Sequence, residues 1–271
     1  MERASVPVGT LPAAVAGFVC LYYGNTGSSW LLSALDGSPS IHVPGFEPIE
    51  DWAWEVSAEE RLRWLETVLS PPQNRTGDEY AQWLAAARES PQVTEDPTDH
   101  DFVLTGLKMN DLAVVDPGAL IDIIDRTGSK VIHLVRANRL KHALSMHRYH
   151  DEDKSQFHGE DRYAPTQIQF GRFKNWMRES ERLHRLGLRL GEQCDQRLGS
   201  DRVLHLAYED FTDAAGKRRT LTRLADFLGI PADFGDGEYV KATPDSLSTA
   251  IVNYPTFRRR YRLTRHAKHL D

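Results

Sequence analysis

Short apolar segments alternate with amphipathic segments along most of this 271-residue chain, and this alternation restricts the fold more than any other feature of the sequence. Apolar runs of strand length occur at 17–23, 40–43, 102–108, 130–135 and 202–206. Helical patterns occur at 30–35, 58–69, 78–88, 117–126, from about 140, at 167–198 and at 217–228. Parallel strands need a crossover between them, and a helix is its usual form. The alternation therefore predicts a three-layer α/β fold, with a central, mostly parallel sheet flanked by helices.

The overall composition is that of a globular protein, with 40% hydrophobic and 27% charged residues, which excludes a disordered or collagen-like chain. The formal net charge of −6 makes nucleic acids and anionic membranes poor partners. This charge is uneven, because segment 46–101 holds 14 acidic and 4 basic residues, whereas 253–271 holds 6 basic residues and 1 acidic residue. We expect one domain over 1–271, with a helical acidic insert at about 50–101 and a basic C-terminal segment at about 253–271.

The number of cysteines and the length of the apolar runs indicate the cellular compartment that we expect for this protein. Cys20 and Cys194 are the two cysteines, too few for a disulfide-stapled secreted scaffold, so we expect reduced, buried thiols in a cytoplasmic protein. The longest apolar run, Ala13–Tyr23, is shorter than the roughly 20 residues that cross a bilayer. No membrane span is therefore expected.

A glycine- and hydroxyl-rich loop, Gly24–Ser29, follows the first apolar strand and precedes a helix that starts at Trp30. Such loops bind phosphate through backbone N–H groups and the positive end of the helix, which makes the predicted fold P-loop-like. The Gly-Lys-Ser/Thr ending of nucleotide hydrolases is missing, and no magnesium ligand is evident. The alternative to a phosphate-binding loop is a plain strand–turn–helix, in which Ser28 or Ser29 caps the helix.

A basic segment lies at the junction of a later strand and helix. Residues 130–148 include five Lys or Arg and no acid, and Arg136 comes directly after the apolar strand. The carboxyl end of a parallel strand is the ligand edge of the sheet, where an arginine can bind phosphate with two parallel hydrogen bonds. Ser145 follows nine residues later. The alternative is a solvated basic helix face.

These two segments, together with Ala-Tyr-Glu-Asp-Phe at 207–211, Phe-Leu-Gly-Ile at 227–230 and Ala-Ile-Val-Asn-Tyr-Pro-Thr-Phe at 250–257, resemble sulfotransferases that use 3′-phosphoadenosine 5′-phosphosulfate (PAPS). The likeness is greatest to bacterial carbohydrate- and lipid-type enzymes. The family pattern implies that the 5′-phosphosulfate is held by Asn25, Thr26, Gly27, Ser28, Ser29 and Trp30. It also implies that Arg136 and Ser145 hold the 3′-phosphate, that Tyr208 lies near the adenine, and that Arg258 and Arg259 close over the 3′-phosphate.

The chain departs from the family pattern at two places. The family loop usually carries Arg or Lys where Asn25 stands, and the paired Arg and Ser are often eight residues apart rather than nine. Arg139 is the alternative to Arg136. Lys108, at the end of a predicted strand, would supply the positive charge that Asn25 lacks.

The resemblance implies transfer of a sulfuryl group to a hydroxyl of a small-molecule, glycan or lipid acceptor, with adenosine 3′,5′-bisphosphate (PAP) as product and no metal. We expect Glu47 to be the base, because a carboxylate beside Phe46 and Pro48 would have a raised pKa, and His42 is the second choice. The acidic insert favours a neutral or cationic acceptor. Two alternatives remain: another P-loop-like enzyme such as a small-molecule kinase, and a non-catalytic nucleotide-binding protein. The sequence leaves the oligomeric state open.

Overall fold

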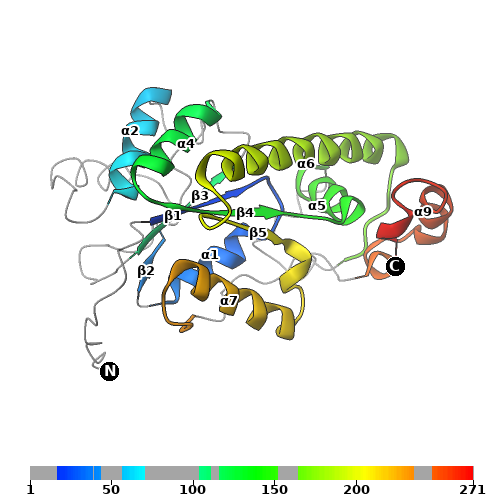
Figure 1. Ribbon diagram of the computed structural model, residues 1–271. Coiled ribbons are helices and arrows are strands. Elements are labelled where there is room, and N and C mark those ends of the chain that lie inside the picture. The colour runs from blue at the N-terminus through cyan, green and yellow to red at the C-terminus, as the bar shows by residue number, and fades with distance from the viewer. Residues whose placement is uncertain are drawn as a thin grey trace.

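The computed structural model describes residues 17–38, 40–43, 57–70, 104–110, 116–151, 164–234 and 246–270, and it confirms the three-layer α/β fold (Figure 1). Five strands form one sheet in the order β2-β3-β1-β4-β5, and every pairing is parallel. The strands are β1 (Gly17–Tyr22), β2 (Ile41–His42), β3 (Leu104–Asn110), β4 (Lys130–Val135) and β5 (Val203–Ala207). The helices are α1 (Ser28–Asp36), α2 (Ala58–Leu69), α4 (Pro117–Arg126), α5 (Arg139–Asp151), α6 (Phe170–Leu198), α7 (Ala214–Leu228), α8 (Leu247–Ala250) and α9 (Tyr254–Tyr261), with short 3₁₀ turns η4 (Tyr208–Phe211) and η5 (Ala267–His269).

The central strand β1 is buried along its whole length, and its side chains alternate between two hydrophobic cores. Val19 and Leu21 pack in a core with apolar residues of α2, α4 and the C-terminal half of α6. Phe18, Cys20 and Tyr22 pack in a second core with α1 and α7. Helices therefore cover both faces of the sheet, as a parallel sheet requires.

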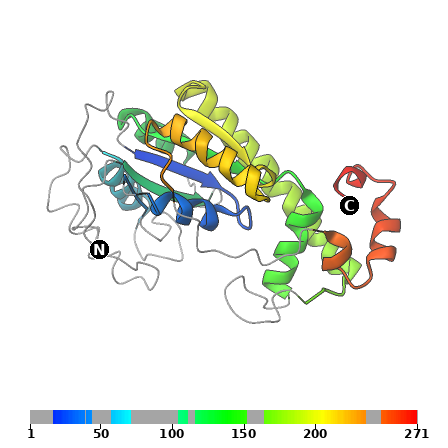
Figure 2. The ribbon, with the colours of Figure 1, turned by 90° about the horizontal axis from the view of Figure 1, so that it is seen from below.

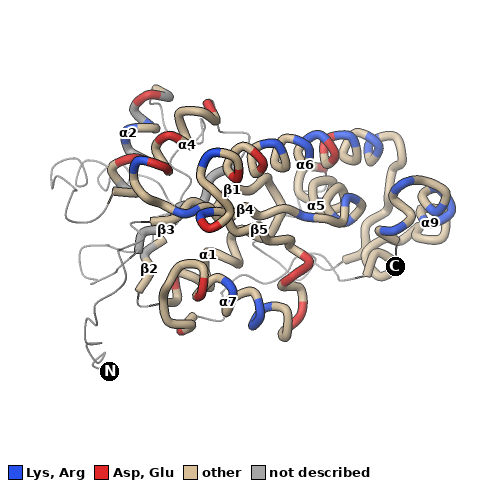
Figure 3. Tube along the Cα trace, viewed as in Figure 1, with Lys and Arg blue, Asp and Glu red and all other residues tan. Residues whose placement is uncertain are grey.

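A third core lies beyond the carboxyl ends of the strands, where α5, the N-terminal part of α6, α8 and α9 pack together (Figure 2). Phe173 of α6 and Phe257 of α9 meet edge to face, with ring centroids 5.4 Å apart. Figure 3 shows Lys and Arg along α6 and around α9. The basic C-terminal segment thus packs on the helices beside the carboxyl edge of the sheet.

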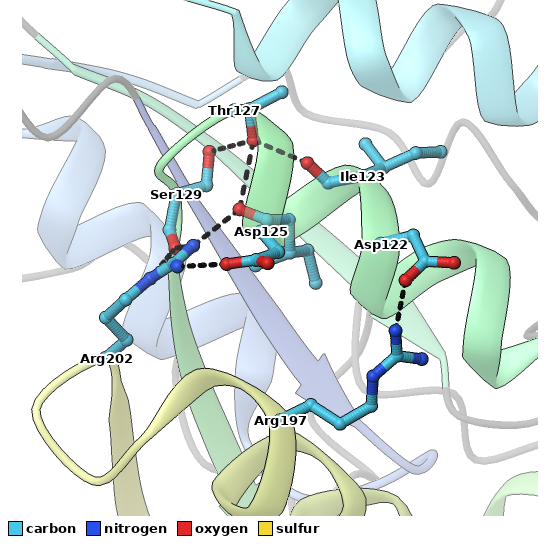
Figure 4. A network of polar contacts seen from close by, with 8 residues as sticks. Asp122, Ile123, Asp125, Thr127, Ser129, Arg197 and Arg202 are labelled. Carbon is cyan, nitrogen blue, oxygen red and sulfur yellow. Dashed lines mark hydrogen bonds and ion pairs between the residues drawn. The ribbon is translucent and has the colours of Figure 1, made fainter.

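The opposite edge of the sheet is fixed by an arginine network (Figure 4). Arg202, just before β5, donates to the carboxylate of Asp125 at 2.6 Å and to the backbone oxygens of Ile124 and Ser129. Ile124 and Asp125 lie in the last turn of α4, and Ser129 directly precedes β4. The network therefore ties α4, β4 and β5 together at the edge away from the phosphate-binding candidates.

The predicted helices 58–69 and 117–126 match α2 and α4 residue for residue. The first helix differs, because it begins at Ser28 with Gly27 as its N-cap, so neither serine caps it with its side chain. β3 continues to Asn110, two residues beyond the predicted end. The helical pattern at 78–88, and most of the acidic insert, lie outside the described residues.

Among the helices in the described ranges, none combines the length and apolar character needed to cross a membrane.

Candidate functional site

The glycine-rich loop leaves β1 at the carboxyl edge of the sheet and turns sharply into α1. Asn25 and Gly27 have positive φ values of 64° and 84°. Gly27 is required for a second reason, since a Cβ there would lie 2.7 Å from Cδ2 of the Tyr208 ring. The loop is thus pressed between its own helix and the 3₁₀ turn that follows β5.

Two carbonyl groups of the loop point toward α5 and the end of β4. The Gly24 oxygen lies 2.8 Å from Nε2 of His142, and the Asn25 oxygen accepts a 2.9 Å hydrogen bond from Nη1 of Arg136. Because a trans peptide is planar, the N–H groups of Asn25 and Thr26 point the opposite way. Within the described part of the chain, no acceptor is bound to the backbone N–H groups of residues 25–30. The loop and the first turn of α1 therefore present a set of open donors.

His142 is neutral in this arrangement. Burial, and then the positive charge of Arg136, lower its pKa to about 3. Its Nδ1 lies 2.7 Å from the Ser180 hydroxyl, so we assign the proton to Nε2, which donates to Gly24 while Nδ1 accepts from Ser180. A neutral histidine holds the loop carbonyl without adding charge to the site.

The fully buried hydroxyl of Tyr23 joins the loop to the end of β4. It accepts hydrogen bonds from the Arg136 backbone N–H at 2.8 Å and from Nη1 of Arg139 at 2.9 Å. Its own proton can go to the Arg136 carbonyl at 3.1 Å or to Nδ1 of His184 at 3.2 Å. Burial raises the pKa of Tyr23, so it remains a phenol. The backbone N–H and the backbone carbonyl of Arg136 are thereby both within hydrogen-bond distance of one hydroxyl.

Several buried donors at this junction have no partner among the described residues. They are Nε of Arg136, Nη2 of Arg139 and Oγ1 of Thr26. Arg136 is 4% exposed, and its guanidinium lies over the Tyr208 ring, 4.4 Å from the centroid. Buried polar groups are nearly always satisfied, so unpaired guanidinium nitrogens beside a loop of open N–H groups fit an anionic ligand.

The structure brings together most of the predicted phosphate-binding residues, although they are far apart in sequence. The Ser145 hydroxyl donates to Oδ1 of Asn25 at 3.2 Å, so Asn25 meets both Ser145 and Arg136. Tyr208 contacts Gly27 and Arg136, as described above. Trp30 stacks on Phe211 with centroids 5.0 Å apart. Ser28 and Ser29 lie in the first turn of α1.

Arg258 and Arg259 are exposed on α9, and no contact among the described residues links them to Arg136. The C-terminal segment reaches the site further along, where the Asn138 side chain donates to the His269 carbonyl at 3.2 Å. Burial, Lys268 and Arg139 lower the pKa of His269 to about 4. Within the described residues, the hydrogen bond of this segment to the junction thus comes from η5, and the roles of Arg258 and Arg259 stay predictions.

The three candidates for proton transfer and charge stabilisation are described only in part. Glu47 lies outside the described residues. His42 is in β2, paired with Thr105, and Lys108 pairs with Cys20 of β1, two residues before the end of β3; the side chains of both lie outside the description. Among the described residues, no group of His, Cys, Asp or Glu is arranged to hold a metal ion.

Sequence reasoning missed Tyr23 and His142, and it missed Glu209, whose carboxylate accepts from the N–H groups of Ala137 and Asn138. One feature of the sequence could have pointed to Tyr23, namely its position between a buried strand and the first glycine of the loop. His142 lies three residues before Ser145, which puts both on one side of a helix. Lys217, also missed, places Nζ 4.8 Å from the Trp30 ring centroid.

No family model and no curated protein matches this chain. Among solved structures, a sulfotransferase from Alicyclobacillus acidocaldarius is 16% identical, with 90% of this chain and 88% of that chain covered and a TM-score of 0.47. A sulfotransferase domain from the Synechococcus PCC 7002 olefin synthase is 18% identical, covering 94% and 86%, with a TM-score of 0.46. A mouse sulfotransferase complexed with PAP is 16% identical, covering 82% and 61%, with a TM-score of 0.41. These likenesses are distant, so the function has to be inferred from the site residues.

Replacing Tyr23 with Phe keeps the ring but removes the hydroxyl that serves Arg136 and Arg139. We expect the free energy of unfolding to fall by about 1–3 kcal/mol, the cost of leaving buried polar groups unsatisfied. Urea denaturation measures this change. The matched control is Tyr149→Phe, at a residue 42% exposed, which should change stability by less than about 0.5 kcal/mol. Equal stabilities for the two variants would contradict the role given to the Tyr23 hydroxyl.

Proposed function

We propose that this chain is a sulfotransferase that moves a sulfuryl group from PAPS to a hydroxyl of a small-molecule, glycan or lipid acceptor. The observation that supports this best is the pairing of two anion-binding features at one edge of the sheet. One is the loop with open N–H groups, and the other is Arg136, whose Nε has no partner in the part of the chain that the structure describes. A nucleotide with separate 5′ and 3′ anionic groups suits two such features side by side.

The roles of the phosphate-binding residues follow from their places. The backbone N–H groups of residues 25–30 and the hydroxyls of Thr26, Ser28 and Ser29 would hold the 5′-phosphosulfate, at the positive end of α1. Arg136 and Ser145 would hold the 3′-phosphate. Tyr208, packed against the loop at Gly27, would line the adenine side.

The bound donor would supply a sulfuryl group for in-line attack by the acceptor oxygen, with a phosphate as the leaving group. The part played by this chain is mainly positioning and electrostatic stabilisation, as in phosphoryl transfer. Loop N–H groups would stabilise charge on the leaving phosphate without reorganising. Because Asn25 brings no charge, the added positive charge would come from Lys108.

Glu47 is our choice for the base that removes the proton of the acceptor hydroxyl, with His42 second. The acceptor is proposed to be neutral or cationic, because the acidic insert follows Glu47 directly in the sequence. Efficient sulfation of a heparin-like polyanion would contradict this part of the proposal.

Calorimetric titration separates the proposed donor from the kinase alternative. We expect PAP to bind more tightly than ATP with Mg²⁺, because the site offers donors for a 3′-phosphate and its loop has no Gly-Lys-Ser/Thr ending. ATP binding equal to or tighter than PAP binding would reject the sulfotransferase assignment. Binding of PAP without transfer from PAPS to any acceptor in a panel of glycans, lipids and secondary metabolites would favour a non-catalytic protein.

Replacing Glu47 with Gln should lower turnover by about 10²-fold or more while PAP affinity stays the same, since a positioned base contributes roughly that factor. Steady-state rates with PAPS and any acceptor found in the panel give the measurement. Glu50→Gln is the control, as it makes the same change of charge three residues away. Full activity of Glu47→Gln would remove Glu47 from the mechanism.

A further inference from the structure

The carboxylate of Glu209 binds the strand-to-helix junction that carries Arg136. Its Oε2 accepts from the Ala137 N–H at 2.9 Å, and its Oε1 accepts from the Asn138 N–H at 2.8 Å. These two residues lie between β4 and α5, and Asn138 caps α5 by accepting from the Lys141 N–H at 2.9 Å. Both oxygens of one carboxylate thus fix two successive peptide units directly after Arg136.

The neighbouring residue, Tyr208, fixes the other half of the site. Its ring fills the space beside Gly27 in the loop and lies under the Arg136 guanidinium. Tyr208 and Glu209 are consecutive in η4, which begins where β5 ends. One dipeptide therefore spans the loop after β1 and the junction after β4, and it sets the distance between them.

We propose that Glu209 is a positioning residue for the donor site: by holding the backbone of 137–138, it keeps the Arg136 guanidinium against the loop at Asn25. This proposal rests on the proposed function in one respect, the identity of the anion that Arg136 binds. The contact that this positioning would preserve is the 2.9 Å hydrogen bond from Nη1 of Arg136 to the Asn25 carbonyl.

Because Glu209 is charged, the direction in which anion affinity changes on its replacement tests the proposal. The negative charge of this carboxylate acts to raise the pKa values of Arg136, His184 and His269, so Glu209 lies close enough to the site to act on a bound anion. A carboxylate beside an anion site repels the anion, so on charge alone its removal should tighten anion binding. If Glu209 acts by positioning, its removal should weaken anion binding instead.

The test compares PAP affinity in Glu209→Gln and Asp210→Asn. Asp210 is the next residue of η4, and its Oδ2 accepts from the Ala207 N–H at 2.9 Å rather than from an N–H of the residues 137–138. The two variants lose the same charge in the same turn. We expect Glu209→Gln to weaken PAP binding about tenfold, the scale of one charged hydrogen bond, and Asp210→Asn to stay within about twofold of the unsubstituted protein. PAP affinity that is unchanged or tighter in Glu209→Gln would overturn the proposal.

Hydrogen exchange of the segment 136–142 tests the same proposal without any nucleotide. We expect faster amide exchange there in Glu209→Gln and unchanged exchange in Asp210→Asn. If the unsubstituted protein binds no PAP, the donor assignment fails, and the positioning role is then decided by hydrogen exchange alone. Unchanged exchange at 136–142 would overturn it.

Affinities are compared at a temperature where far-UV circular dichroism shows each variant folded, so that a loss of folded protein is not counted as a loss of affinity. If Glu209→Gln does not fold, Glu209→Asp takes its place. Asp keeps the charge but is one methylene shorter, so it cannot bridge both N–H groups at the same distance. We expect weaker PAP binding there too, although the charge is unchanged, and an unaltered affinity would count against the positioning role.

Discussion

The hydrogen bonds between the Tyr23 hydroxyl and the backbone of Arg136 join the two halves of the candidate site. β1 and β4 are neighbours in the sheet, so the loop after β1 and the junction after β4 leave the same edge side by side. Tyr23 fixes their relative position, because its buried hydroxyl accepts a hydrogen bond from the Arg136 N–H and donates one to the Arg136 carbonyl. Together with the hydrogen bond from Arg136 to the Asn25 carbonyl, this contact fixes the position of Arg136 relative to the loop.

Burying a guanidinium is costly unless its charge and its donors are matched. Burial lowers the pKa of Arg136, while Tyr208 and Glu209 act in the opposite direction. The Asn25 carbonyl satisfies one nitrogen and the Tyr208 ring covers the face, but Nε stays unpaired within the described residues. An anion would complete this set, and the open N–H groups of the loop lie beside it. A bound anion would offset the cost of burying Arg136.

Sequence patterns predicted the layers, the parallel sheet and the local segments, because these depend on periodicity and on short-range signals such as Gly229 after α7, with its φ of 74°. The resemblance to sulfotransferases implied that Asn25, Arg136 and Ser145 serve one donor, and these three residues do lie in contact. Sequence patterns did not predict Tyr23 or Glu209, since the hydrogen-bond partners of these side chains are 71 to 161 residues away in the sequence. The same limit applies to the hydrogen bond between Asn138 and the His269 carbonyl of η5, which joins residues 131 positions apart and was not predicted.

The central claim is that Arg136 is placed to bind the 3′-phosphate of the donor. A thermodynamic cycle that combines one substitution with the removal of one ligand group tests it most directly. PAP and adenosine 5′-monophosphate, which lacks the 3′-phosphate, are titrated into the unsubstituted protein and into Arg136→Lys, where the charge is kept but the forked geometry is lost. The account predicts that the substitution weakens PAP binding by about tenfold or more and leaves the binding of adenosine 5′-monophosphate nearly unchanged. An equal loss for both nucleotides, or no loss for PAP, would contradict it.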